Sequence, residues 1–100
     1  MGTKPRRRPE RLAGKLRQIR EALGLSQSEM WRRLGVEDLI VFKQISAYEV
    51  GQREPTLLIL LRYAEAAGVW IDVLVNDDLD LPEKLPAKPK SEGVKRRKGR

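Results

Sequence analysis

The sequence contains no cysteine and no histidine. Without cysteine the chain has no disulfide, no thiolate nucleophile and no thiolate metal ligand. Without histidine it lacks the commonest general base, metal ligand and pH switch of proteins. No apolar run approaches the roughly 20 residues that a membrane-spanning helix needs. We therefore expect neither an enzyme nor a metal or cofactor site, and no membrane insertion.

The length of 100 residues suits one compact domain, and 40% hydrophobic residues suffice for a small core. The first ten residues are basic but lack the apolar segment of a signal peptide. These features predict a protein that stays in the cytoplasm.

Positive charge is concentrated at the two ends of the chain, although the formal net charge is +7 overall. Residues 1–11 carry five basic and one acidic side chain, residues 82–100 carry eight and two, and residues 12–81 carry eight and eleven. Basic ends of this kind usually accompany nucleic-acid binding, and less often binding to anionic membranes, for which neither end has an apolar anchor. We predict a basic arm over residues 1–8, a folded domain over 9–80 and a disordered tail rich in proline, lysine and arginine over 81–100.

Apolar periodicity predicts two helices in the first third of the chain. Residues 12–23 carry an amphipathic stripe, and Gly24 is a natural left-handed stop. Ser26 and Glu29 form a Ser-x-x-Glu capping box, which begins a second helix that runs to Gly35.

Two more helices are predicted in the second half of the chain. One begins after Thr56 as N-cap and stops at Gly68, and a short one ends near Asn76, before an acidic stretch that we expect to be solvated. The buried face of the longer helix is predicted to consist of Leu57, Leu60, Leu61 and Ala64, widened by Leu58 and Ile59.

The stretch between residues 36 and 54 is harder to interpret. Its apolar run, LIVF, would suit a strand, but no other part of the chain has a composition that could pair with it. Val41, Ile45 and Tyr48 follow helical spacing, which predicts a helix over about 41–50. The other side of that helix is small or polar and is therefore available to a partner.

Two short helices joined at a glycine, the second with a polar outer side, form a helix-turn-helix. Residues 12–76 resemble the Cro/C1-type (XRE-family) helix-turn-helix domain of bacterial and phage repressors. The resemblance rests on four linked motifs: Arg-x-x-x-Gly-Leu-Ser-Gln, Leu-Gly-Val, Ile-Ser-x-Tyr-Glu-x-Gly-x-Arg-x-Pro and Leu-Leu-x-Tyr-Ala. It implies an all-α fold, a compact five-helix bundle of the lambda-repressor-like kind, usually dimeric, that reads the major groove of DNA with the third helix.

The resemblance also implies three sets of functional residues. The pair Arg20 and Glu49 would form a structural salt bridge between the first and third helices. Lys43 suits the acceptors of guanine and Gln44 an adenine edge. For every base and phosphate position, the alternative is an ordinary solvated side chain. The base contacts would come from Phe42, Lys43, Gln44, Ser46 and Ala47, and the phosphate contacts from Ser26, Gln27 and Arg53.

The chain departs from the family pattern between the second and third helices. Eight residues, Glu37 to Gln44, stand between Val36 and Ile45, which is more than the family has. The surplus residues 37–40 either lengthen the third helix, with Asp38 as its N-cap, or enlarge the turn, and we favour the longer helix.

Two tryptophans stand where the family has other kinds of residue. Trp31 replaces a small residue, and our hypothesis is that it holds the two helices apart and packs against Leu39 or Phe42. Trp70 replaces a polar cap, and it either packs within the monomer or joins Val69 and Val73 in a dimer contact.

The function predicted from these features is a sequence-specific DNA-binding transcriptional regulator, a repressor that occupies an operator on double-stranded DNA as a homodimer, associated with the bacterial nucleoid. The tail would add phosphate contacts rather than merely solubilise the chain. One alternative is an antitoxin whose residues 82–100 fold onto a toxin protein, for which only Leu81, Leu85 and Val94 offer apolar contacts. The other is a helix-turn-helix used only for protein interaction, which the acidic middle and the altered turn would favour.

Overall fold

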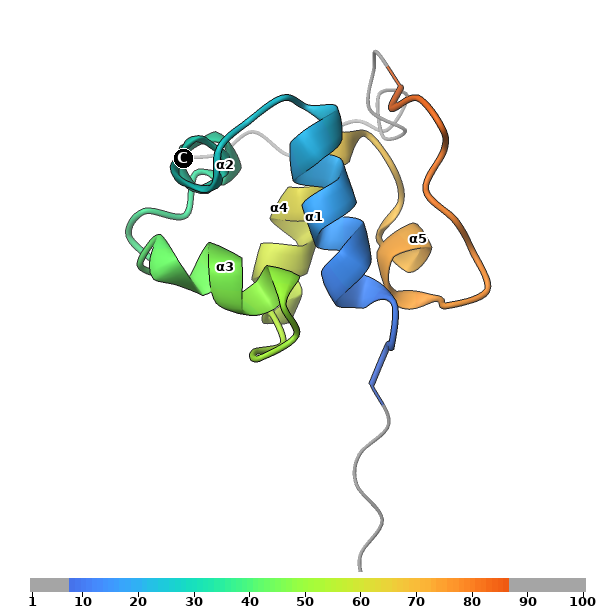
Figure 1. Ribbon diagram of the computed structural model, residues 1–100, viewed down its shortest axis with the longest axis horizontal. Coiled ribbons are helices and arrows are strands. Elements are labelled where there is room, and N and C mark those ends of the chain that lie inside the picture. The colour runs from blue at the N-terminus through green and yellow to red at the C-terminus, as the bar shows by residue number, and fades with distance from the viewer. Residues whose placement is uncertain (1–7, 87–100) are drawn as a thin grey trace, which may run out of the picture.

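Five helices make up the described part of the chain, residues 8–86, in the computed structural model (Figure 1). Their bounds are α1 (Leu12–Ala22), α2 (Gln27–Leu34), α3 (Lys43–Glu49), α4 (Leu57–Ala67) and α5 (Ile71–Val75). Residues 8–86 contain no strand, so the predicted all-α five-helix fold is confirmed. No helix in this range is long and apolar enough to cross a membrane.

The central helix of the bundle is α1, which packs against α3, α4 and α5. Figure 1 shows α3 on one side of α1 and α5 on the other, with α4 behind. The second helix, α2, packs against α3 and α4. As a result α3 is supported by α1 and α2, on the side of the molecule opposite α5.

Local hydrogen bonds explain where the helices begin and end. The Ser26 hydroxyl accepts from the Glu29 N–H at 3.1 Å and the Glu29 carboxylate accepts from the Ser26 N–H at 2.8 Å, which is the predicted capping box. The bond from the Ser26 backbone N–H to the carboxylate holds the pKa of Glu29 below its ordinary value. Gly35 ends α2 with φ 69°, a left-handed conformation in which a side chain would be strained.

The core forms where the five helices meet, but α4 presents a different face to it than predicted. Leu57, Leu58 and Leu61 are 74%, 44% and 43% exposed, so the predicted face is wrong for these three residues. A run of five apolar residues, 57–61, contains no polar side chain that would fix the helical phase. The side chains of α4 that are buried are Ile59, Leu60, Tyr63, Ala64 and Ala67.

The start of α1 is held by the acidic segment that follows α5. The Asp77 carboxylate accepts hydrogen bonds from the backbone N–H groups of Glu10 and Arg11 at 2.9 and 3.0 Å. Arg11 in turn donates to the Asp77 carbonyl oxygen at 2.7 Å and pairs with Asp80. The acidic segment is therefore more than a solvated patch, because it caps a helix that lies far away in sequence.

Lys15 joins α1 to the end of α5. Its side chain is buried, and its ammonium donates to the carbonyl oxygens of Val73 and Asn76 at 2.7 and 3.0 Å. A cation at this end of a helix satisfies the last carbonyl groups and interacts favourably with the helix dipole. Burial lowers the pKa of Lys15. Sequence reasoning did not single out this residue.

The packed chain continues past residue 80, where the predicted tail begins. Leu81 is buried, and Leu85 packs against the core. The predicted boundary is therefore too early. The rest of the predicted tail, 87–100, and residues 1–7 of the predicted arm lie outside the described residues.

Candidate nucleic-acid interface

One side of α3 faces solvent. Lys43 is exposed near its beginning and Val50, the C-cap residue, is 64% exposed at its end. Ser46 and Ala47 are half-buried between them. The four residues are spaced i, i+3, i+4 and i+7, so they lie on one side of the helix. We call Lys43, Ser46, Ala47 and Val50 the outer ridge.

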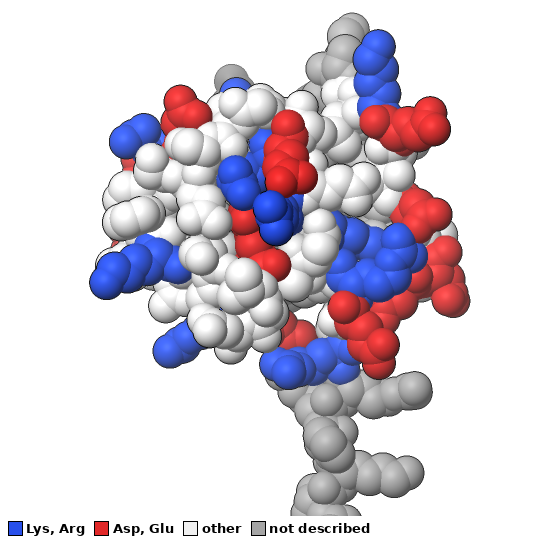
Figure 2. Space-filling view, in the orientation of Figure 1, with Lys and Arg blue, Asp and Glu red and all other residues white. Residues whose placement is uncertain are grey.

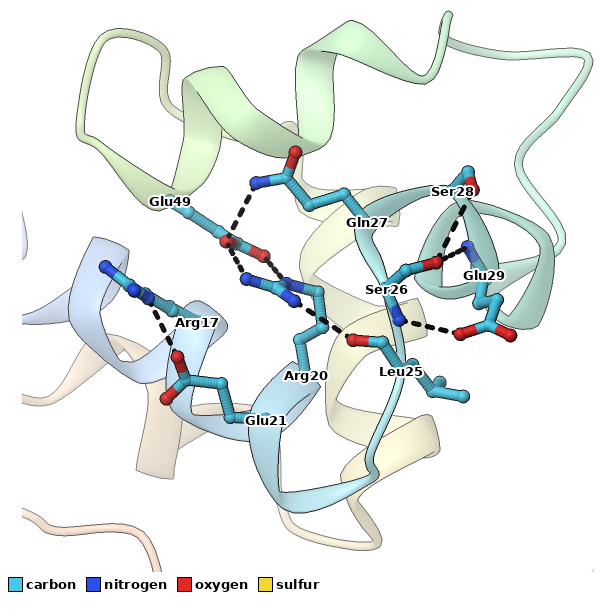
Figure 3. A network of polar contacts seen from close by, with 9 residues as sticks. All are labelled: Arg17, Arg20, Glu21, Leu25, Ser26, Gln27, Ser28, Glu29 and Glu49. Atoms are coloured by element: carbon cyan, nitrogen blue, oxygen red, sulfur yellow. Dashed lines mark hydrogen bonds and ion pairs between the residues drawn. The ribbon is translucent and has the colours of Figure 1, made fainter.

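The opposite side of α3 is fixed to α1 by an ion pair (Figure 3). Glu49 has a side chain that is 2% exposed, and its two carboxylate oxygens accept from Arg20 Nε at 2.7 Å and Nη2 at 3.0 Å. Arg20 Nη1 also donates to the Leu25 carbonyl oxygen at 3.0 Å. The bond to Glu49 raises the pKa of Arg20. The two residues that the resemblance pairs thus form a bidentate contact, which sets the rotation of α3.

Gln27 and Ser26 have partners within the protein. Gln27, the first residue of α2, donates from Nε2 to Glu49 Oε1 at 3.3 Å (Figure 3). A phosphate would therefore have to take the second N–H of this amide. The Ser26 hydroxyl accepts in the capping box. Arg53, the third predicted phosphate residue, is exposed in the loop after α3.

The residues between α2 and α3 form an enlarged turn. The Val36 carbonyl oxygen accepts from the N–H groups of Leu39 and Ile40 at 2.9 and 3.0 Å, and α3 begins only at Lys43. The N-cap of α3 is Phe42. The prediction that residues 37–40 lengthen this helix, with Asp38 as its N-cap, is therefore wrong.

Trp31 explains why the turn is enlarged. Its indole N–H donates to the Ile40 carbonyl oxygen at 2.8 Å. In a longer helix that carbonyl would accept from the N–H of Gln44, which instead donates to Val41 at 3.0 Å. The Trp31 ring also contacts the Phe42 ring, with centroids 6.2 Å apart and planes tilted by 57°. The structure thus gives Trp31 one of the two contacts in our hypothesis, the one with Phe42.

The five predicted base-contact residues lie in different environments. Lys43, Ser46 and Ala47 belong to the outer ridge. Phe42 is 47% exposed just before the ridge, beside Trp31. Gln44 is half-buried, and its Oε1 is buried without a hydrogen-bond partner among the described residues. The carbonyl end of Gln44 is therefore turned away from the side on which a base would lie.

Sequence reasoning missed Val50 as a member of the outer ridge. Its position seven residues after Lys43 was a usable signal, because residues at that spacing share one side of a helix. Val50 was left out because only small and polar residues were expected on this side of the helix. As an exposed valine, it adds apolar surface to the ridge.

The charges on the surface differ between the two sides of the molecule. Figure 2 shows acidic side chains gathered at the right, over the segment after α5, whereas the left side, over α3, is mainly uncharged with separate basic side chains. Four basic residues of α2, α3 and the loop after α3 are exposed, namely Arg32, Arg33, Lys43 and Arg53. Within residues 8–86 no group of acidic side chains is placed to hold a metal ion. A polyanion would accordingly meet less repulsion at α3 than at α5.

The sequence of this chain matches one family model. The family model HTH_3, described as helix-turn-helix, matches residues 16–74, a stretch that reaches from α1 to α5 and includes α2, the turn and α3. No curated protein and no solved structure matches the chain. The matched stretch is more than half of the 100 residues and contains both members of the Arg20–Glu49 pair. This chain therefore belongs to the HTH_3 family of DNA-binding helix-turn-helix proteins of the XRE (Cro/C1) type.

Proposed function

We propose that this protein is a sequence-specific transcriptional regulator that represses by occupying an operator. The observation that supports this most directly is the contrast between the two sides of α3: the outer ridge faces solvent, and the opposite side is fixed through Glu49 to Arg20. The major groove is wide enough to admit an α-helix. Ser46 and Ala47 are small enough to let the α3 backbone approach the bases, and Lys43 can donate to the O6 and N7 atoms of guanine.

To repress by occupancy, the protein needs only to bind its operator and cover it. The operator lies on the chromosome, so we place the protein in the bacterial cytoplasm with the nucleoid. Arg53 follows α3 directly and is proposed to contact a phosphate beside the groove. Gln27 is proposed to add a second phosphate contact with the amide N–H that Glu49 does not take.

We also propose that the protein binds its operator as a homodimer. Trp70 is 49% exposed at the start of α5, and Val75 and Leu79 are exposed nearby in sequence. Aromatic residues are enriched in interfaces. Since Val69 is buried, the dimer contact would use Trp70 with Val75 rather than with Val69. A contact at α5 leaves α3 accessible, because the two helices lie on opposite sides of α1 (Figure 1).

One observation argues against the antitoxin alternative. Leu81 and Leu85, two of the three apolar residues available to a toxin protein at this end of the chain, pack against the protein's own core. We therefore retain the regulator as the proposed function.

Site selection from a random duplex pool, followed by titration of the selected duplex at two salt concentrations, tests the proposal. We expect an enriched sequence motif, bound far more tightly than random duplex under the same conditions. Saturable binding without an enriched motif would mean attachment by charge alone. No binding at low salt would favour a helix-turn-helix used for protein interaction.

The matched pair of variants for this experiment is Lys43→Ala and Lys84→Ala. Both remove one exposed lysine, but Lys84 lies after the helical bundle. We expect Lys43→Ala to relax the preference at one or two base pairs and Lys84→Ala to leave the motif unchanged. Identical motifs for both variants would remove Lys43 from base recognition.

A further inference from the structure

The enlarged turn carries exposed apolar side chains. Leu39, Val41 and Phe42 are 50%, 61% and 47% exposed. They occur within four consecutive residues, next to the first residue of α3. Single exposed apolar residues need no explanation, but a group of this kind often marks a binding surface.

This apolar surface is held in place. The indole of Trp31 binds the Ile40 carbonyl oxygen at 2.8 Å, and its ring contacts Phe42. The carbonyl oxygens of Val41 and Phe42 accept from the first N–H groups of the following turn, at 3.0 Å each. The side chains of Val41 and Phe42 therefore extend from a fixed backbone, so little conformational freedom remains to be lost on binding.

The surface is continuous with the outer ridge of α3. Val41 and Phe42 directly precede Lys43, the first residue of that ridge. In helix-turn-helix proteins the amino-terminal residues of the recognition helix are the ones that reach the base edges. An α3 helix seated in the groove thus brings these two side chains to the bases together with Lys43.

Charge makes a phosphate an unsuitable partner for the turn. Glu37 and Asp38 are both exposed, and no basic residue stands between Val36 and Lys43. Any affinity that the turn gives to DNA must therefore come from apolar contact. The one apolar group on the base edges of the major groove is the 5-methyl group of thymine.

We propose that Val41 and Phe42 contact thymine 5-methyl groups, beside the base pair that Lys43 meets. Trp31 is the positioning residue of this site, because it fixes the turn without reaching the bases itself. The inference rests on the proposed function and deepens it, since it names which base the operator must carry next to the Lys43 position.

Replacing thymine by deoxyuridine, which lacks only the methyl group, tests the inference. In the selected operator we expect substitution at one or two positions to weaken binding roughly fourfold each, as expected for one buried methyl group. In Val41→Ala or Phe42→Ala the same replacement has no further effect at the thymine which that side chain contacts. The slope of affinity against salt concentration stays unchanged, because every phosphate contact remains in place.

The control is Leu57→Ala, which shortens an apolar side chain that is 74% exposed at the start of α4 and belongs to no proposed interface. It should keep full sensitivity to the methyl group. Trp31→Phe keeps an aromatic ring but loses the bond to Ile40, and we expect it to reduce the discrimination between thymine and deoxyuridine with the salt dependence unchanged.

Four results would overturn the inference. Equal binding of thymine and deoxyuridine operators by the unchanged protein, or undiminished sensitivity in both alanine variants, would do so while leaving the proposed function intact, because an enriched operator is still bound. A lower mass of Val41→Ala and Phe42→Ala in sedimentation would show that the turn joins two copies of the chain instead. Failure to enrich any operator would overturn the proposed function, and the inference with it.

Discussion

Arg20 on α1 and Glu49 on α3 form two hydrogen bonds between the guanidinium and the carboxylate, at 2.7 and 3.0 Å. Only 2% of the Glu49 side chain is exposed to water. The guanidinium also binds the Leu25 carbonyl oxygen, and Gln27 binds the carboxylate from α2. Three elements thus meet at one carboxylate. The orientation of the outer ridge depends on this contact, because Glu49 lies on the side of α3 opposite Lys43 and Ala47.

Replacing Glu49 by alanine should destabilise the fold strongly. The change leaves the Arg20 guanidinium largely buried without its partner, which costs about 3 kcal/mol or more. For a domain of this size the thermal midpoint should fall by at least about 12 °C. Circular dichroism at 222 nm during heating measures this change.

The matched control for Glu49→Ala is Glu21→Ala. Glu21 pairs with Arg17 one helical turn away at 3.0 Å, but both side chains are more than half exposed. An exposed pair of this kind contributes little, so the midpoint should move by only a few degrees. Equal effects of the two substitutions would show that Glu49 has no special structural role.

The sequence predicted those features that depend on short-range patterns. The capping box of Ser26 and Glu29 and the glycine at the end of α2 follow from residue types at fixed spacing. The pairing of Arg20 with Glu49 was instead implied by the family resemblance. The capping box and the helix-ending glycine each fit one local backbone geometry, so the residue types are enough to predict the structure there.

The errors concern features that depend on distant packing. The buried face of α4 was misjudged because an uninterrupted apolar run fits several helical phases equally well. The turn before α3 was misjudged because its shape depends on a hydrogen bond from Trp31, nine residues before Ile40. Lys15 was overlooked because its partners are backbone carbonyl groups at the end of α5. Every residue has such a group, so these partners leave no pattern in the sequence.

Replacing Trp31 by alanine should also destabilise the fold, though less than Glu49→Ala. The change removes the bond to Ile40, the contact with Phe42 and part of the buried ring, for a loss of about 2 kcal/mol. The midpoint should fall by about 8 to 16 °C. Leu57→Ala is the control, since Leu57 is 74% exposed and belongs to no proposed interface, so its loss should matter little to stability. An unchanged midpoint of Trp31→Ala, with only DNA binding reduced, would refute the structural role of Trp31.

The stability that Asp77 contributes should disappear in acid. The backbone N–H of Glu10, together with that of Arg11, holds the pKa of Asp77 below its ordinary value of 3.8. A depressed pKa means that the ionised carboxylate stabilises the fold above the unfolded value and ceases to do so as the pH falls through the lower folded value. The unchanged protein should therefore melt at a higher temperature than Asp77→Ala at pH 7, and the gap should close below pH 3.8.

Asp78→Ala controls for the loss of one negative charge from the same acidic segment. Asp78 is exposed, and its own backbone N–H binds the side chain of Asn76, which the substitution retains. Its effect on the midpoint should be small at every pH. If the gap between the unchanged protein and Asp77→Ala persisted at pH 2, the capping role of the Asp77 carboxylate would be wrong.

Ending the chain at residue 86 should weaken binding to all DNA sequences by a similar factor. Residues 87–100 carry seven basic and one acidic side chain, and phosphate contacts by such residues contribute affinity without reading the bases. Keeping residues 82–86 matters, because Leu85 packs against the core. The slope of log affinity against log salt should decrease by about 0.9 for each phosphate that the shortened chain no longer neutralises.

A full-length chain with Lys95, Arg96, Arg97 and Lys98 replaced by serine should reproduce most of this loss, since it removes charge and keeps length. If shortening the chain weakened binding to the selected operator but not to random duplex, the tail would take part in sequence recognition. The prediction that residues 87–100 contact only phosphates would then be wrong.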